Sequence, residues 1–372
     1  MTPMNSIQKL MARATCRRQR SEGGFSLVEI MVAVAIALIG IVVIFQVMSL
    51  WEERKRTTSS GSDAQVAGAI AMFNIDRDLR LAGMGFGTST YLGCTVSAYD
   101  TQRSTPAFTF SLYPIQIVDG ASGAPDAVRV LYGASTTVVA GQTFTTSTAI
   151  SKKTSGRAGF NPGDLVLVAG NSPANCALVE ITGNSNGDSL TIDHAQGAYV
   201  NYLGQSVTAR YNDPVGTGGT FSSGVLFDFG PANLAVGTTG VDSPRWNTWE
   251  IQTNNTLVWT DSLHATSSFS VAEGIVDLQA QYGIDANNDK MVDSSEWTVT
   301  TPADWTKVRA IRVAILARSQ QYEKTAVTAN APTWAGGAFV MSNLADGTSW
   351  QNYRYRVYEK VIPLRNMIWG TS

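Results

Sequence analysis

The sequence predicts an α+β protein in which one long N-terminal helix is followed by a β-rich domain with a disulfide bond. Three observations support this fold class. The run from Ile30 to Trp51 contains 22 residues without a formal charge. The sequence then stays compatible with a helix, without proline, to about Ala82. From Thr88 onward, short apolar runs alternate with Gly, Asn, Ser and Pro, which is typical of strands joined by turns.

The apolar run is long enough to cross a membrane. A helix rises about 1.5 Å per residue, so this run spans about 33 Å, which matches the hydrocarbon core of a bilayer. A basic leader with a single acid, Glu22, precedes the run, and its cations are Lys9, Arg13, Arg17, Arg18 and Arg20. A second basic group follows the run: Arg54, Lys55 and Arg56. The larger leader charge favours a cytoplasmic N-terminus and an exported C-terminal part.

Two apolar stripes follow at helical spacing, between the basic group and the glycines that end the helix. One stripe holds Val66, Ile70 and Phe73, and the other holds Met72, Ile75 and Leu79. Two stripes suggest a helix that is covered on more than half of its circumference. We expect its own sheet to cover part of it, with neighbouring subunits as a further cover. The segment "AGMGFG" at 82–87 predicts the end of the helix, because glycine is common just beyond a helix C-terminus.

The strands are expected at apolar runs of seven to fourteen residues. These runs are "AFTFSLYPIQIV", "DAVRVLYG", "GDLVLVAG", "CALVEITG", "GVLFDFG", "KVRAIRVAILARS" and "YRYRVYEKVIPLRN". No internal repeat of fixed period and no low-complexity linker separates them. One β-rich domain after the helix is therefore the simplest organisation.

Composition and motifs argue against two large classes of function. The net charge of −2 leaves no basic surplus to neutralise the phosphates of a nucleic acid. The two histidines, His194 and His264, form no metal-binding pair, and the sequence has no phosphate-binding loop and no nucleophile elbow. We therefore expect neither a nucleic-acid partner nor an enzyme.

The start of the apolar run carries an acid, Glu29, shortly after Gly23 and Gly24. A carboxylate at bilayer depth costs a few kcal/mol, so a role for its negative charge is expected at this position. Cleavage after the glycines would remove only the basic leader. It would leave the membrane helix on the mature chain and expose the amine of Phe25 four residues from Glu29. The alternative is a lone carboxylate that reaches toward the membrane surface from a plain anchor helix.

The segment "GGFSLVEIMVA" resembles the class III leader of type IV pilins and pseudopilins. The resemblance implies that a prepilin peptidase cuts between Gly24 and Phe25 and N-methylates Phe25. It also implies that Glu29 pairs with the Phe25 amine of a neighbouring subunit in the filament. A carboxylate and an ammonium attract each other strongly where the dielectric constant is low.

Further segments resemble PilW-type minor pilins. They are "NIDRDLRLAGMGFG", Gly93–Cys94, "VDLQAQYGIDANNDKMVD", "VRAIRVAILARS" and the terminal "PLRN". The resemblance implies a cleaved leader at 1–24, a transmembrane helix at 25–51, a periplasmic extension of the helix at 52–84 and a β-rich periplasmic or extracellular domain at 85–372. Two alternatives stay open: a minor pseudopilin of type II secretion, and a membrane-anchored binding module or hydrolase that uses a pilin-type leader.

The resemblance also implies a function, a location and partners. The protein would prime type IV pilus polymerisation from the inner membrane and then lie in the pilus, with the tip as a candidate position. Its partners would be the prepilin peptidase, other minor pilins, the major pilin and the assembly machinery in the inner membrane. A tip adhesin is a further candidate partner.

Removal of the leader would discard Cys16 and leave Cys94 and Cys176 as an even pair. The oxidising periplasm favours a disulfide between them. Such a bridge would stabilise the fold by about 4 kcal/mol if it acts by restricting the unfolded chain. The alternative is two buried thiols that lie too far apart to join.

An acidic loop, "DANNDKMVDSSE", is the candidate metal site. Its ligands on the EF-hand pattern would be Asp285, Asn287, Asp289, Met291 through its carbonyl, Asp293 and Glu296. Oxygen ligands at this spacing suit Ca²⁺, and the set from Asp285 to Asp293 is favoured over full use of Glu296. Lys290 stands where glycine normally allows a sharp turn, so the alternative is an Asx-rich turn between two strands. No other cofactor is expected.

Overall fold

The computed structural model describes residues 24–87, 90–135, 141–171, 175–183, 188, 190–214, 221–232, 244–264, 268–344 and 347–368. The leader up to residue 23, with Cys16, lies outside this part. The chain forms two compact units, Met1–Thr57 and Thr58–Ser372, and each unit is described by itself.

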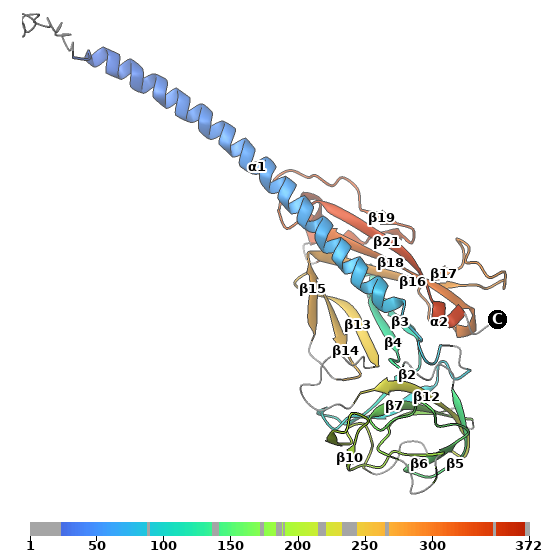
Figure 1. The fold of residues 1–372 in the computed structure, drawn as a ribbon. Coiled ribbons are helices and arrows are strands. Elements are labelled where there is room, and N and C mark those ends of the chain that lie inside the picture. Colours follow the sequence, from blue (N-terminus) through green and yellow to red (C-terminus); the bar gives the residue numbers. More distant parts are fainter. Residues whose placement is uncertain are drawn as a thin grey trace, which may run out of the picture. The chain divides into compact units, whose positions relative to one another are not determined.

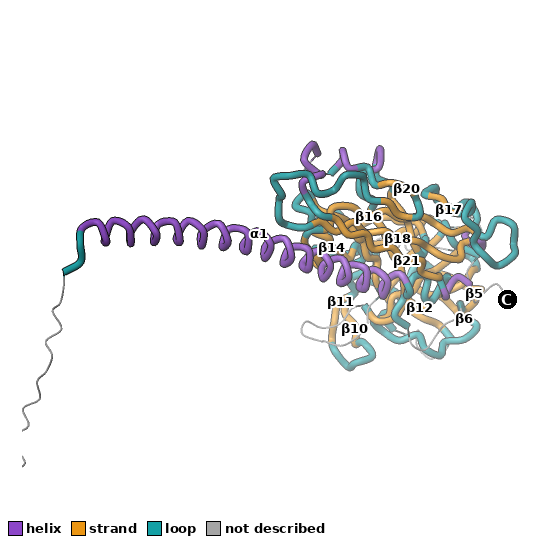
Figure 2. The backbone as a smooth tube through the Cα atoms, turned by 90° about the horizontal axis from the view of Figure 1, so that it is seen from above, coloured by secondary structure: helices purple, strands orange, loops and turns teal. Residues whose placement is uncertain are grey.

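Helix α1 runs continuously from Leu27 to Leu79 and contributes to both units (Figure 2). In the first unit, Leu27–Glu52 has a mean hydropathy of 3.0 and is long and apolar enough to cross a membrane. The helix ends three residues before the expected position near Ala82. There the hydrogen bonds shorten to the i−3 type, as from Ala82 N to Leu79 O, and Gly83 then turns the chain with a φ of +75°.

The second unit contains three larger sheets (Figure 1). The first has the strand order β2-β1-β8-β7-β12-β5-β6-β9. Its strands are β1 (Thr95–Tyr99), β2 (Ala107–Ser111), β5 (Gln142–Ser147), β6 (Ser151–Thr154), β7 (Asp164–Gly170), β8 (Cys176–Glu180), β9 (Thr191–Asp193) and β12 (Gly224–Pro231). The pairing of β1 with β8 is parallel, and the other pairings in this eight-stranded sheet are antiparallel.

The other two sheets adjoin α1 and are antiparallel throughout. The five-stranded sheet, in the order β15-β14-β13-β4-β3, consists of β3 (Ile115–Val118), β4 (Ala127–Tyr132), β13 (Arg245–Gln252), β14 (Thr256–Asp261) and β15 (Phe269–Glu273). The four-stranded sheet, in the order β17-β16-β18-β21, consists of β16 (Ile275–Ile284), β17 (Trp297–Thr298), β18 (Val308–Arg318) and β21 (Tyr355–Pro363).

Short elements connect these sheets. Two ribbons pair β10 (Ala198–Val200) with β11 (Ser206–Thr208) and β19 (Thr333–Trp334) with β20 (Gly337–Ala338). Short helices lie at η1 (Ala121–Gly123), η2 (Trp305–Lys307), η3 (Met341–Asn343), η4 (Gly347–Asn352) and α2 (Arg365–Ile368). The predicted fold class, a long N-terminal helix followed by a β-rich part with a disulfide, is confirmed.

The C-terminal part of α1 packs on the five- and four-stranded sheets. Its stripe of Met72, Ile75 and Leu79 is buried in the largest hydrophobic core, together with side chains of β3, β4, β16 and β18. The residues of the other predicted stripe stay exposed, at 56% for Val66, 44% for Ile70 and 66% for Phe73. One of the two predicted stripes is therefore buried within the subunit.

Asp78 anchors the end of this helix to strand β13. Its carboxylate is buried and accepts hydrogen bonds from Asn247 Nδ2, at 3.0 and 3.1 Å, and from Trp249 Nε1, at 2.6 Å. Burial raises the pKa of Asp78. The three bonds compensate in part for removing the carboxylate from water.

Strand β21 approaches α1 closely at Gly68. A Cβ atom at this position would clash with the ring of Tyr358, so only glycine allows the contact. The Tyr358 hydroxyl donates a hydrogen bond of 2.8 Å to the carbonyl of Gln65. A second link between the same elements is the ion pair of Lys360 with Asp76, at 3.0 Å.

The predicted disulfide between Cys94 and Cys176 is present, with the two Cα atoms 6.0 Å apart. It joins the residue before β1 to the first residue of β8. It therefore fixes these two parallel strands at their starts. Both cysteines are buried in the core of the eight-stranded sheet.

Two buried carboxyl groups lie where the five-stranded sheet meets β16. Asp126 accepts hydrogen bonds from Gly120 N, at 2.9 Å, and Ala280 N, at 2.8 Å. Asp277 is fully buried; its Oδ1 accepts from Gln279 Nε2, and its Oδ2 has no partner in the described part of the chain. Burial raises the pKa of Asp126 to about 6 and that of Asp277 to about 7.

Asp277→Asn should flatten the dependence of stability on pH. Because the folded pKa lies above the ordinary value, the protonated form stabilises the fold at low pH, and this contribution is lost as pH rises through about 7. Between pH 5 and pH 8 the free energy of unfolding should fall by roughly 2 kcal/mol more in the wild type than in the variant. Denaturant unfolding at both pH values measures this, with the exposed Asp289→Asn as control. Equal slopes for wild type and Asp277→Asn would contradict the assignment.

Candidate processing and assembly site

The predicted cleavage bond lies just before helix α1. Residues 24–26 have no regular secondary structure, and the helix begins at Leu27, with a hydrogen bond of 3.1 Å from Ile30 N to Ser26 O. A Cβ atom at Gly24 would meet nothing within 4 Å. The fold of this unit therefore does not require glycine there. A requirement for a small residue at this position would therefore come from another protein, such as a peptidase that recognises the site.

Phe25 and Glu29 lie on either side of the helix start. Phe25 is 77% exposed, and Glu29 is an exposed residue in the first turn of α1. The helix dipole favours an acid at this end. No ion pair involves Glu29 in the described part of the chain. The carboxylate is thus displayed among exposed apolar side chains, without a counter-ion from the residues of its own chain that the structure describes.

The acidic loop connects strand β16 to strand β17, as the alternative of a turn between two strands predicts. Asp285, at its start, is fully buried, and its Oδ2 accepts from Arg309 Nε and from Lys290 N, both at 3.1 Å. Asp285 Oδ1 has no hydrogen-bond partner among the described residues. The first predicted ligand is therefore held by an arginine of the neighbouring strand β18.

Two other carboxylates of the loop, those of Asp289 and Glu296, accept hydrogen bonds from the loop itself. Glu296 accepts from Ala286 N and Asp293 N, each at 2.9 Å. Asn287 Oδ1 accepts from Asp289 N, and Asp289 Oδ1 accepts from Met291 N. These bonds hold the turn together and pair the side chains of Asn287, Asp289 and Glu296 with backbone amides nearby.

Lys290 adopts the left-handed conformation, with a φ of +69°, so the turn that glycine would allow is made here by lysine. The described residues contain no group of three or more His, Cys, Asp or Glu arranged to hold a metal ion. Calcium binding at this loop stays a prediction.

The sequence reasoning missed Asp78, which is the most heavily hydrogen-bonded polar contact of the helix with the sheets. A signal was present, because Asp78 lies three residues after Ile75 and one before Leu79 in the stripe that packs on the sheets. An acid at that helical position faces the core and needs donors there.

Two family models match the chain. Residues 19–45 match the prokaryotic N-terminal methylation motif, which covers Gly24, Phe25 and Glu29. Residues 251–366 match the family described as Type IV Pilus-assembly protein W, which extends from β13 to α2 and includes the acidic loop. Together they support a PilW-type type IV pilin. No curated protein and no solved structure matches the chain.

The two matches together support a pilus-assembly-related pilin, and the PilW match favours a structural, non-enzymatic role. The single apolar helix with a prepilin motif fits a membrane-anchored pilin. In this PilW-type chain, the methylation motif lies in the first unit and the PilW match in the second. The context implies prepilin processing and contact with other pilus components.

Proposed function

We propose that this protein is a minor pilin that primes type IV pilus polymerisation and takes a position at the pilus tip. The observation that supports this role is the presence of a methylation motif and a PilW domain in one chain. The leader at 1–24 is removed, 25–51 spans the inner membrane, 52–84 extends the helix and 85–372 forms the exported domain. The N-terminus of the precursor lies in the cytoplasm and the C-terminal domain in the periplasm.

Processing exposes a charged amine at Phe25. This amine supplies a counter-ion for Glu29, which has none among the described residues of its own chain. Prepilin peptidase cuts the bond between Gly24 and Phe25, which lies outside the helix, and methylates the new amine, which keeps its charge. In the filament, Glu29 of one subunit faces the Phe25 amine of another. The attraction is strong there because the surrounding helices exclude water. The other minor pilins, the major pilin and the inner-membrane machinery are the partners, with a tip adhesin as a further one.

Gly24→Glu should block processing. A large charged side chain before the bond does not fit a peptidase that requires a small residue there. The variant should migrate on a gel as a form longer by the 24-residue leader, while the mature wild type begins at Phe25 in N-terminal sequencing. Gly40→Ala, at a position where a Cβ atom also meets nothing, is the control and should be processed normally. A mature wild-type chain that begins elsewhere would contradict the assignment.

Glu29→Ala should be processed normally but should fail to support assembly. In cells that lack the chain, the wild type should restore surface pili, and the variant should restore less than about a tenth of them, because a loss of about 1.4 kcal/mol already lowers an association constant tenfold. Electron microscopy and sheared-pilus blots measure this. Normal piliation by Glu29→Ala would reject the ion pair. Failed enzyme export with intact pili after deletion would instead indicate a type II secretion pseudopilin.

We further propose that the acidic loop binds calcium weakly. Asp285, Asn287 and Asp289 supply oxygens at EF-hand spacing, and a buried oxygen of Asp285 is without a hydrogen bond. Calcium at 5 mM should raise the melting temperature of the protein by a few degrees, and Asp289→Ala should abolish the shift. Asp188→Ala, at a carboxylate outside this loop, is the control. An equal shift in Asp289→Ala would show that calcium does not bind here.

A further inference from the structure

The parallel pairing of β1 with β8 ends soon after it begins. Only Val96 with Cys176 and Ser97 with Ala177 are paired, although both strands continue. The Asn212 side chain then takes the place of β1 beside β8. Its Oδ1 accepts from the amide of Glu180, and its Nδ2 donates to the carbonyl of the same residue, both at 2.8 Å. The two strands are therefore joined at their starts and separate toward their ends.

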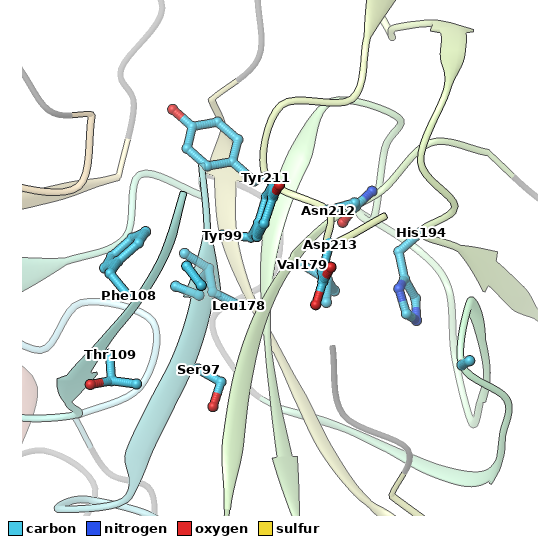
Figure 3. Close-up of a pocket in the computed structure, with 13 residues that line it drawn as sticks. Ser97, Tyr99, Phe108, Thr109, Leu178, Val179, His194, Tyr211, Asn212 and Asp213 are labelled. Carbon is cyan, nitrogen blue, oxygen red and sulfur yellow. The ribbon is translucent and has the colours of Figure 1, made fainter. Parts of the chain in front are cut away.

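A pocket of about 380 Å³ opens where they separate. Figure 3 shows Phe108 and Thr109 on one side of it, Asp213 and His194 on the other, and Ser97 between them. The volume lies at the small end of the range for ligand sites, which suits one or two small rings. The disulfide at the strand starts fixes the closed end of this opening.

A face rich in hydroxyl groups continues from the pocket along β1 and β2. Directly paired residues share a face of a sheet, and here the pairs are Thr95 with Ser111, Ser97 with Thr109 and Tyr99 with Ala107. The four Ser and Thr side chains are exposed, and Tyr99 is half-buried. None of these six side chains is charged. The face thus offers hydroxyl donors and acceptors beside an aromatic ring.

The side chains at the pocket argue against an anionic ligand and against a purely apolar ligand. None of the pocket-lining residues that the structure describes is lysine or arginine, and Arg103, which lies over the Phe108 ring, is already paired with Asp100, so the walls are poorly suited to an anion. Burial lowers the pKa of His194 to about 3, so its ring is neutral, and its Nε2 lies 2.9 Å from Nζ of the buried Lys152. A purely apolar ligand would remove water from the hydroxyls and from Asp213 without replacing their hydrogen bonds.

We propose that this pocket and the adjoining hydroxyl face bind a neutral carbohydrate. One sugar ring enters the pocket, where its apolar face contacts the ring of Tyr99, which shares the face of Ser97 and Thr109, and its hydroxyls bond to Asp213 and Ser97. The following sugar units lie along β1 and β2 on Ser97 and Thr109. This site is separate from pilus assembly, so its failure would leave the proposed function untouched.

Saturation-transfer NMR on the full-length protein tests the proposal. The protein is kept in a detergent without sugar headgroups, because a glycosidic detergent would compete. The probes are methyl glycosides of glucose, galactose, mannose and N-acetylglucosamine with their trisaccharides, and glucuronic acid is the anionic comparison. At least one neutral sugar should receive saturation, and more than glucuronic acid does. No signal from any neutral sugar, or a stronger one from glucuronic acid, would overturn the proposal.

Two variants and one matched control locate the binding. Ser97→Gln places a longer side chain at the mouth of the pocket from an exposed position, so the fold should tolerate it. Tyr99→Ala removes the half-buried ring. Each should lower the saturation signal at least fivefold, whereas Tyr202→Ala, at an exposed tyrosine on the turn between β10 and β11, should not. An undiminished signal in a folded Ser97→Gln protein, or an equal loss in Tyr202→Ala, would place the binding elsewhere and refute the proposal.

Discussion

The contact between the C-terminal part of α1 and two sheets holds the second unit together. Met72, Ile75 and Leu79 bury one face of the helix against strands that come from both halves of this unit. Apolar burial supplies the non-directional part of the attraction. Asp78 adds direction, because its carboxylate is in place only when the donors of β13 meet it. The helix register on the sheets is thereby fixed, and with it the position of every strand that packs beside it.

The same helix has an opposite character in the first unit. Leu27–Glu52 exposes apolar side chains on all sides, and Glu29 has no cation from its own chain in the part that the structure describes. An isolated subunit in water could not expose so much apolar surface at low cost, and lipid or neighbouring helices would cover it. The unpaired carboxylate has the opposite preference, because it is well solvated in water and needs a counter-ion once lipid surrounds it. Helix α1 therefore combines a segment suited to the subunit interior with one suited to membrane and filament.

Much of this fold could be predicted from the sequence, because its signals are local. Each quoted apolar run contains a strand, the glycines at 82–87 follow the helix end, and the two remaining cysteines form their bridge. The order of strands could not be predicted. β4 lies between β3 and β13, and β1 pairs with β8 some 80 positions away, so these neighbours depend on packing between distant segments. The burial that raises the pKa values of Asp126 and Asp277 arises from the same contacts between distant segments.

Gly68 has a consequence for the order in which the protein can be completed. The Tyr358 ring that occupies the space above this glycine comes from 293 positions after Gln65, whose carbonyl it binds. β21 is also the last strand that the structure describes. During synthesis, the helix emerges first, and its contact with Tyr358 cannot form until the 293 positions after Gln65 have been made. Translocation and membrane insertion can thus proceed before this contact exists, and β21 completes the packing around the helix long after the helix itself has been made.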